Sequence, residues 1–486
     1  MPNRITQYAT PANEKNRLNE TGIYSQDQWT IDRLTLNPGV RFDLMVGRVP
    51  PQEFPGTQDP GAWSGVAFGN DWLPPVNFDE VSSKPDWKDV SPRVGAAYDL
   101  FGNGRTAIKV AVGRYVGKSS TNMVAANNPI NTPINSANRS WNDANGDYVP
   151  DCDLSNFSAN GECGTIDNSF FGQQNPNVKR WDPDLLSGWR KRDYNWDMSL
   201  EVQQELREDL SVSAGYFYNT GGYFSSASGY GNLGDSKIRL TDNVLVSGAD
   251  YDEYCVTAPV DPRLPNGGGY EICGLYDIIP GKFGQVESVI SPVGDFKLGH
   301  HFFNASLDGR FPNGAQLGRG VDTGRSVQEQ CFMVDSPQQL MHCRVTTPFK
   351  AQTQFKVFGS LPLPGEMVIS VTYQHLSGPT FNATFAYTSA QIAGSLGRPL
   401  AGRRSTATVP LVAPQTLFED RTSRLDLRVS KIVNYNRFRL QVNFDADNAL
   451  NSSPVQASNS TFGSRWGNPT RIIDPRIFEI GGQIDF

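Results

Sequence analysis

Stretches of about ten residues in which apolar and polar side chains alternate recur along the whole chain. In "RFRLQVNFDA" (437–446), Phe438, Leu440, Val442 and Phe444 occupy every second position, and Arg, Gln, Asn and Asp fill most of the positions between them. A period of two places the two sets on opposite faces of a β-strand, whereas a helix would repeat every 3.6 residues. The pattern therefore predicts an amphipathic strand.

Thirteen such segments predict an all-β chain. They lie at about 23–31, 34–46, 92–100, 105–117, 194–206, 210–219, 302–310, 314–323, 349–361, 366–375, 422–433, 436–446 and 476–486. Most are longer than a common globular strand of about 5–6 residues. They are long enough for a tilted strand that crosses a bilayer, which needs about 9–11 residues.

The connections between these segments alternate between short and long. The short ones are 32–33, 101–104, 207–209, 312–314, 362–366 and 434–435, and the long ones run about 47–91, 118–193, 220–301, 324–348, 376–421 and 447–475. This alternation is typical of an antiparallel transmembrane β-barrel of the outer-membrane type, with short periplasmic turns and long extracellular loops. We expect the apolar face to contact outer-membrane lipid and the polar face to line the lumen.

Six cysteines fall in the long loops, two per loop. Their spacing predicts three local disulfides, Cys152–Cys163, Cys255–Cys273 and Cys331–Cys343, and hence an oxidising compartment. The alternative is a set of free or metal-bound thiols, although no CxxC occurs and the four histidines form no zinc pattern. The disulfides and the loop lengths assign the same face to the outside of the cell.

Bulk composition excludes several classes of function. The 43 basic and 50 acidic residues give a net charge of −7, which argues against a nucleic-acid partner. No run of 18 apolar residues predicts a membrane-spanning helix. The serines lie in no G-x-S-x-G motif and no acid/base pair stands out, so we predict no enzyme activity.

An odd number of strands predicts an incomplete barrel, because bacterial single-chain barrels normally have an even number. We interpret residues 1–20 as the remnant of an extracellular loop and 21–486 as the C-terminal portion of a barrel domain. The N-terminus also lacks the apolar stretch of a signal peptide. We expect the strands near 23–31 and 476–486 to lie at the seam of a sheet that is either open or closed as a smaller barrel.

One loop has the pattern of a calcium site. In "NDANGDYVPDCDL" (142–154), Asp143, Asn145, Asp147, Asp151 and Asp153 alternate with other residues, and Gly146 permits a tight turn. Hard oxygen ligands on a flexible loop suit Ca²⁺, although the final bidentate Glu of an EF-hand is replaced by Leu154. The alternative is an ordinary solvated acidic turn.

Other polar residues receive structural interpretations. The segment 263–274, between two cysteines, is interpreted as a rigid external lobe that braces its neighbours. The alternative is that the lobe contacts the ligand. The predicted inward-facing charges are Lys109, Glu201, Arg428, Arg437, Arg439 and Asp445.

Several stretches resemble the TonB-dependent outer-membrane receptors, specifically their Oar-like barrel group. They include "DWKDVSPRVGAAYDLFGNGRTAIKVAVGRY" (86–115), "RDYNWDMSLEVQQELREDLSVSAGYF" (192–217), "DYDEYCVTAPVDPRLPNGGGYEICGLYD" (250–277), "VTTPFKAQTQFKVFGSLPLP" (345–364) and the final strand. The resemblance implies a barrel of about 22 strands, of which this chain holds about thirteen.

The resemblance also implies a function. Members of this group take up a bulky, scarce solute, with energy that reaches a plug through the TonB system. We expect a transporter barrel that lacks the plug and the TonB box, so that contact with the TonB system would use the missing N-terminal region. A surface adhesion or interaction barrel without transport is the alternative, and a secreted soluble all-β protein is a third hypothesis. A siderophore, a cobalamin, a glycan and a peptide are all compatible with such a barrel.

Overall fold

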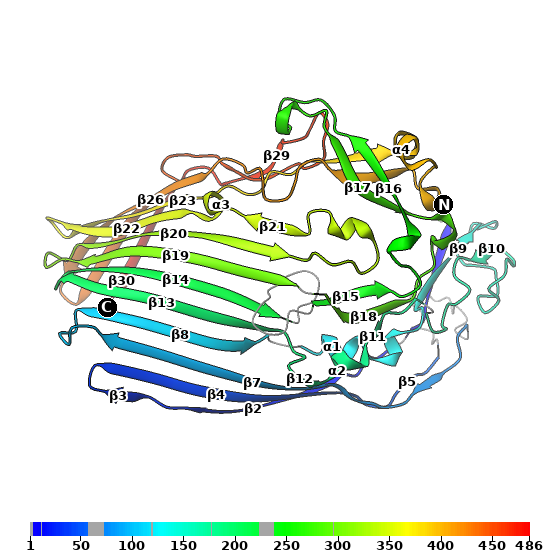
Figure 1. The fold of residues 1–486 in the computed structure, drawn as a ribbon, viewed down its shortest axis with the longest axis horizontal. Helices are drawn as coiled ribbons and strands as arrows, with labels where there is room; N and C mark the ends of the chain where they lie inside the picture. The colour runs from blue at the N-terminus through cyan, green and yellow to red at the C-terminus, as the bar shows by residue number, and fades with distance from the viewer. Residues whose placement is uncertain are drawn as a thin grey trace.

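A curved antiparallel sheet dominates the computed structural model of the protein (Figure 1). The structure describes residues 3–10, 12–56, 72–117, 120–175, 177–222, 238–294 and 296–486. Thirteen strands follow one another across the described sheet in chain order. They are β2 (Arg17–Gln26), β4 (Leu34–Val49), β7 (Val81–Asp99), β8 (Thr106–Val116), β13 (Tyr194–Arg207), β14 (Leu210–Gly222), β19 (Lys297–Arg310), β20 (Gln316–Glu329), β22 (Gln354–Leu363), β23 (Met367–Leu376), β26 (Thr422–Tyr435), β27 (Phe438–Asp447) and β30 (Ile477–Asp485). Each overlaps one predicted segment, so the fold prediction is confirmed.

The register of this sheet gathers apolar side chains on one face and polar side chains on the other. One row of direct partners crosses four strands through Ile369, Val429, Phe444 and Ile480. The neighbouring row crosses the same strands through Ser370, Arg428, Asp445 and Glu479. Adjacent residues of a strand point to opposite faces, so the sheet has an apolar, outward face and a polar, inward face.

The two ends of the sheet differ in their connections, as Figure 1 shows. At one end lie tight turns, such as the turn that joins β7 to β8. There Asp99 accepts hydrogen bonds from the backbone N–H groups of Gly102 (2.9 Å) and Gly104 (2.8 Å). Both glycines have positive φ, 73° and 72°, which glycine adopts without strain. The long loops gather at the opposite end.

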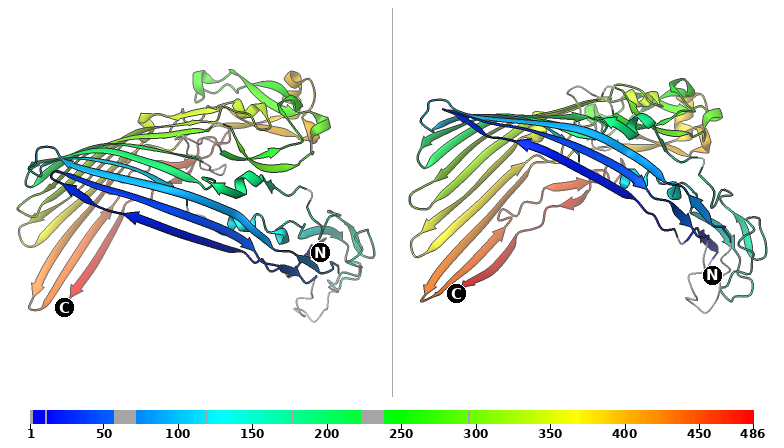
Figure 2. Two further views of the ribbon diagram at one scale, coloured as in Figure 1. Left: turned by 60° about the horizontal axis from the view of Figure 1, so that its bottom comes forward. Right: turned by 90° about the horizontal axis from the view of Figure 1, so that it is seen from below.

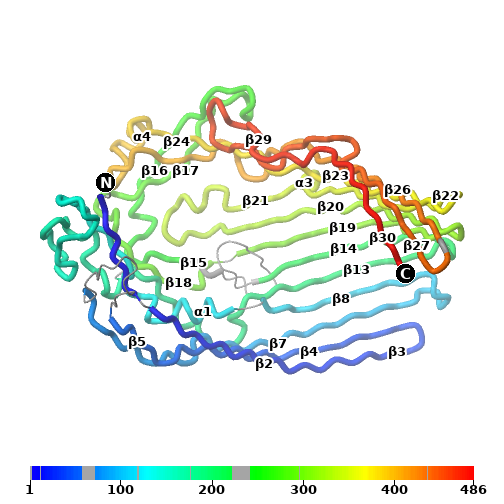
Figure 3. The backbone as a smooth tube through the Cα atoms, turned by 180° about the vertical axis from the view of Figure 1, so that it is seen from behind, coloured from blue at the N-terminus to red at the C-terminus, as the bar shows by residue number. Residues whose placement is uncertain are grey.

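The sheet is open. β2 and β30 form its two edges, and no pairing among the described residues joins them (Figure 2). The N-terminus lies at the loop end and the C-terminus at the turn end (Figure 3). The predicted seam strands are therefore the edge strands, and the sheet takes the open form of the two that the sequence allowed.

The long loops contain short elements of their own. Three extend the main sheet: β3 (Trp29–Ile31), β12 (Ser187–Trp189) and β21 (Arg344–Thr347). The others are β1 (Arg4–Tyr8), β5 (Gln52–Phe54), β6 (Val76–Phe78), β9 (Ser136–Trp141), β10 (Cys163–Ile166), β11 (Arg180–Trp181), β15 (Ile238–Asn243), β16 (Tyr251–Thr257), β17 (Glu271–Ile278), β18 (Ser288–Val293), β24 (Thr384–Thr388), β25 (Thr406–Pro410), β28 (Val455–Ser458) and β29 (Pro469–Ile472).

Helices are short and confined to these loops. They are α1 (Asn122–Ala125), α2 (Pro183–Leu186), α3 (Phe349–Gln352) and α4 (Ser389–Leu396), with 3-10 turns at Pro129–Asn131, Gly248–Asp250, Pro265–Gly267, Pro280–Lys282, Pro337–Leu340 and Ala401–Arg403. Within the described ranges, no helix has the length and apolar character that a membrane crossing requires.

Three details of the sequence interpretation are wrong. Residues 349–352, predicted as the start of a strand, form α3 instead. Arg17 to Glu20, assigned to a loop, already belong to β2. Cys163, Cys255 and Cys273 lie on short strands, although the sequence predicted that all six cysteines lie in loops without strands of their own. Hydrophobic alternation marks only long amphipathic strands, so it missed these short ones.

Candidate functional site

A row of polar side chains crosses six strands on the inward face, near the loop end. Direct partners run from β7 to β20 in the order Arg93, Gly113, Asp197, Asn219, His300 and Ser326. Asp197 accepts hydrogen bonds from the side-chain amides of Asn195 (2.9 Å) and Asn219. His300 Nδ1 lies 2.7 Å from Ser326 Oγ, which also accepts a hydrogen bond from Gln352 Nε2 (2.8 Å). The row offers hydrogen-bond donors and acceptors over a wide surface.

Two aromatic rings lie in the next row toward the turns. Phe217 and Phe302 are direct partners on β14 and β19, and Ser199 and Gly324 flank them on β13 and β20. A Cβ at position 324 would lie 2.4 Å from the Phe302 ring, so only glycine lets that ring rest over β20. The inward face thus carries an apolar platform beside the polar row.

The polar row and the rings line one groove of about 960 Å³. Tyr115 stands at its side, with the guanidinium carbon of Arg93 4.4 Å from its ring centroid. Ligand pockets in proteins are concave and combine apolar walls with a few polar groups that fix orientation. The groove therefore fits a solute with a flat or apolar body and a polar edge.

Among the predicted inward charges, Arg428 donates two hydrogen bonds to Asp445 (2.5 and 3.1 Å). Arg439 lies 3.4 Å from Asp485. Lys109 donates a hydrogen bond to Gln203 (2.6 Å), and Gln203 in turn donates one to Glu201. Arg437 lies in the turn before β27, with its guanidinium carbon 5.4 Å from the Phe438 ring centroid. Side-chain hydrogen bonds thus connect neighbouring strands on the polar face.

Three of the long loops pack into one unit outside the sheet, which we call the crown. Its buried residues come from the hairpin β16–β17, from the segment 383–412 that contains β24, α4 and β25, and from Trp466. Trp466 is 1% exposed, and its indole N–H donates a hydrogen bond to the Asn382 carbonyl (2.9 Å). A hydrophobic core of this kind fixes the loops relative to one another.

A buried ionic cluster joins two loops of the crown. The Asp277 carboxylate, 1% exposed, contacts Arg398 Nη1 at 2.5 Å and pairs with Arg404. It also accepts a hydrogen bond from the Ala401 backbone N–H (2.9 Å). Arg398 binds Asp252 as well, at 2.8 Å. Buried carboxylates persist where charges and donors compensate them in this way.

The lobe 263–274 belongs to the crown. Its disulfide joins Cys255 to Cys273 on neighbouring strands. Arg263 places its guanidinium carbon 4.6 Å from the Trp466 ring centroid and donates a hydrogen bond to the Trp466 carbonyl (3.0 Å). These contacts agree with a bracing role.

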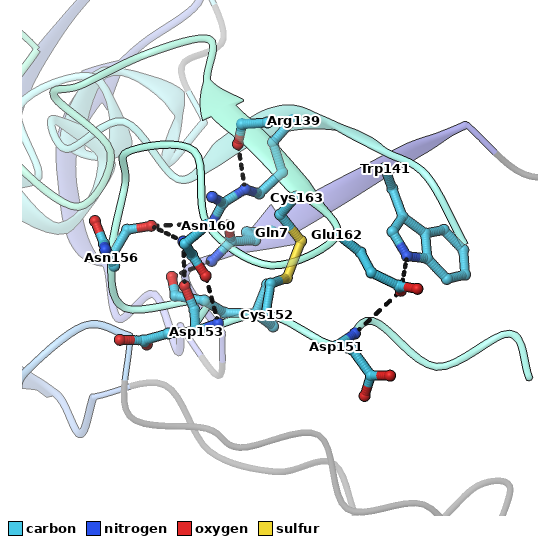
Figure 4. Close-up of a disulfide and its surroundings, with 12 residues drawn as sticks. Gln7, Arg139, Trp141, Asp151, Cys152, Asp153, Asn156, Asn160, Glu162 and Cys163 are labelled. Atoms are coloured by element: carbon cyan, nitrogen blue, oxygen red, sulfur yellow. Dashed lines mark hydrogen bonds between the residues drawn. A yellow bond between two sulfur atoms is a disulfide. The ribbon is translucent and has the colours of Figure 1, made fainter. Parts of the chain in front are cut away.

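The acidic loop is held by its own backbone and by a disulfide (Figure 4). Asp143 accepts hydrogen bonds from the N–H groups of Gly146 (2.8 Å) and Tyr148 (3.1 Å). The Asn145 amide nitrogen donates to Asp147 (3.1 Å) and Asp151 (2.9 Å). Hydrogen bonds from the Ser155 hydroxyl and N–H lower the pKa of Asp153 below its usual value.

The structure pairs the cysteines as Cys152–Cys163, Cys255–Cys273 and Cys331–Cys343. Across the described residues, the one grouping of three metal-ligating side chains is Cys255, Glu271 and Cys273, and both of its cysteines are disulfide-bonded. Calcium binding by residues 143–153 remains a prediction from the sequence.

Comparison with known proteins agrees with the architecture. Residues 1–235 match the family described as outer membrane beta barrel domain. The strand order and the two-faced sheet give the chain the fold of an outer-membrane β-barrel wall. Its location is the bacterial outer membrane.

A curated relative supports the resemblance to the Oar-like group. The barrel protein is 26% identical to the TonB-dependent transporter Oar of Myxococcus xanthus over 327 residues, which is 60% of this chain and 26% of that relative. The barrel protein thus spans about a quarter of the relative's length.

Solved structures of other barrels are more distant. The outer membrane transporter YddB from Escherichia coli has 11% identity and a TM-score of 0.44, over 96% of the barrel protein and 54% of YddB. The FrpB iron transporter from Neisseria meningitidis has 10% identity and a TM-score of 0.43, over 96% and 45% of the two chains.

Sequence reasoning missed a buried ion pair at the loop end of the barrel wall. Arg114 donates a hydrogen bond to Asp89 at 2.8 Å, and their side chains are 5% and 1% exposed. Arg114 also donates to the Val90 carbonyl (3.1 Å) and lies 4.3 Å from the Tyr194 ring centroid. No signal in the sequence predicts this pair, because Arg114 has the strand position of an outward-facing residue.

Proposed function

We propose that this chain forms part of the barrel of a TonB-dependent outer-membrane transporter that takes up a bulky, scarce solute. The observation that carries the proposal is the inward groove of about 960 Å³, which lies at the loop end of a polar barrel wall. A solute that enters from outside would meet the crown first and then the polar row.

The number of strands in the wall favours a lumen that is wide enough for a bulky solute. Thirteen strands already exceed the eight-stranded barrels whose interior is filled by side chains. The resemblance to Oar supports dependence on the TonB system. We place the TonB contact in the region that corresponds to the unmatched part of that relative.

Uptake by cells that carry the intact transporter tests the proposal. Four labelled solute classes are supplied: a ferric siderophore, a cobalamin, a glycan and a peptide. We expect one class to accumulate, and we expect an uncoupler that removes the proton gradient to stop the accumulation, because the TonB system draws its energy from the inner membrane.

Two results would contradict transport. In one, a solute binds at the cell surface but does not accumulate, which would favour the adhesion barrel. In the other, accumulation is unaffected by the uncoupler, which would indicate a passive pore. Cells that lack the gene serve as the control for background uptake.

A further inference from the structure

One row of the apolar face ends at an arginine that has no polar partner in the described part of the chain. Direct partners run across five strands through Val112, Met198, Tyr218, His301 and Arg325. Arg325 is exposed and has no hydrogen bond or ion pair with any residue that the structure describes. An arginine on a lipid-facing surface is costly near the bilayer midplane, whereas at headgroup level it can attract an anionic lipid.

Another outward cation is satisfied within the protein. Lys431, opposite Met367 and Val442, donates a hydrogen bond to the Gly365 carbonyl. The acidic residue that follows Arg325 on the same face of β20 is Glu329, and it is engaged by Lys297 (3.3 Å) and Arg344 (3.8 Å). Among the described residues, the Arg325 guanidinium therefore has no polar partner, and no available carboxylate lies nearby on its strand.

Aromatic side chains surround this guanidinium. Tyr216, His301, Phe303 and Phe349 form with Arg325 a pocket of about 470 Å³ on the outward face. The Tyr216 and Phe303 rings lie 5.1 Å apart, and the Tyr216 hydroxyl lies 2.8 Å from His301 Nδ1. Phe349 comes from α3, and its ring lies 6.4 Å from Phe303. The short helix thus adds one wall to the pocket.

The position of Arg325 along its strand places it near the outer leaflet. Arg325 is nine residues above Gln316, where β20 leaves the periplasmic turn. At about 3.4 Å per residue and a tilt of about 40°, this is a height of roughly 23 Å, close to the upper limit of an apolar band of about 25 Å. The guanidinium therefore reaches the level of the outer-leaflet headgroups.

We propose that Arg325 and its aromatic pocket form a binding site for an anionic, phosphate-bearing lipid of the outer leaflet. The planar guanidinium offers paired N–H donors that match phosphate oxygens. The rings of Phe303 and Phe349 are 45% and 44% exposed and offer an apolar surface to the adjoining acyl chain. The site lies on the face opposite to the solute groove, so it does not depend on transport.

A second arginine on the same strand provides a matched control. Arg319 is also exposed, outward-facing and without a partner in the described part of the chain, and its direct partners are Leu307 and Val357. It lies only about 8 Å above Gln316 by the same geometry, near the inner leaflet. The two arginines therefore lie at the levels of different leaflets of the membrane.

Native mass spectrometry of the protein, extracted from membranes in mild detergent, tests the proposal. Lipid A, phosphatidylglycerol, an uncharged diacylglycerol and inorganic phosphate are added in separate titrations. We expect saturable binding of the two anionic lipids and not of diacylglycerol. Arg325→Gln should weaken that binding about fivefold, the loss expected for one surface cation. Arg325→Lys should lose less, and Arg319→Gln should leave the high-affinity lipid in place.

The competing outcomes are distinct. Equal lipid binding by wild type and Arg325→Gln would overturn the site, and so would an equal loss in Arg319→Gln. Displacement of the lipid by inorganic phosphate at a similar concentration would overturn the lipid assignment in favour of a free-phosphate site. Circular dichroism confirms that each variant is folded, and Arg325→Lys keeps the test decisive if Arg325→Gln does not fold.

Discussion

Phe444 on β27 and Ile480 on β30 are direct partners in the sheet, and yet 45% and 80% of their surfaces are exposed. Their neighbours in the same row, Val429 and Ile369, are also apolar. Exposing an apolar surface this extensive and continuous to water costs free energy, and contact with lipid would remove that cost. We therefore expect the pair to lie on the surface that faces the membrane.

An arginine on this surface should destabilise the protein in lipid. We expect Ile480→Arg to lower the free energy of unfolding in vesicles by about 2–4 kcal/mol if the site lies near the bilayer midplane. Gly481→Arg is the matched control, because a Cβ at Gly481 would meet no atom within 4 Å and the residue points to the polar face. Denaturant titration of both variants measures the difference, and equal losses would argue against lipid contact.

Filling the groove should block uptake. Ser199 faces the groove, whereas Leu200, the next residue, is 48% exposed on the apolar face. We expect Ser199→Trp to reduce solute accumulation at least severalfold and Leu200→Trp to leave it unchanged. Surface labelling checks that both variants reach the outer membrane in equal amounts. Normal uptake by a well-expressed Ser199→Trp would exclude the groove from the solute path.

Removing the Asp277 carboxylate should loosen the crown. Arg398 and Arg404 would then face a neutral side chain, and breaking a buried pair costs about 3–5 kcal/mol. We expect Asp277→Asn to increase hydrogen exchange in β24 and β25 while β26 and β27 stay protected. Exchange measured by mass spectrometry distinguishes this local effect from global unfolding. Unchanged protection in the crown would mean that its hydrophobic core alone holds the loops.

The lobe should respond to acid through Asp261, which lies two residues before it and accepts hydrogen bonds from its first residue, Arg263. The hydrogen bond from the Arg263 side chain lowers the pKa of Asp261 to about 2. A lowered pKa stabilises the folded lobe above the unfolded value of about 3.9, and that contribution disappears as the pH falls through the folded pKa. Wild type should therefore exchange more slowly than Asp261→Asn above about pH 4, and the difference should shrink as the pH falls and vanish below about pH 2. A difference that is independent of pH would contradict this pairing.

Sequence periodicity predicted all thirteen described strands of the wall but not their full length. β7 begins at Val81, eleven residues before the predicted start, and β19 begins at Lys297 rather than at residue 302. Both strands continue beyond the apolar band. There the outward positions no longer need to be apolar, so the alternation that defines the strand in the sequence ends before the strand does.

The candidate site was less accessible to prediction. The groove joins residues from six strands, and its shape depends on register rather than on any local motif. The crown depends on contacts such as that between Asp277 and Arg398, which are 121 residues apart. Loop segments have no periodic pattern, so the sequence could locate the disulfide-bearing loops but not their packing.

Spin labels placed one at a time along β27, from Phe438 to Asp447, test the central claim most directly. Accessibility to oxygen, which partitions into lipid, is compared with accessibility to a water-soluble nickel complex for the protein in vesicles. The account predicts a period of two, with oxygen favoured at Leu440, Val442 and Phe444 and nickel favoured at Gln441, Asn443 and Asp445. Uniform accessibility, or the opposite phase, would contradict a wall with lipid on one face and a polar lumen on the other.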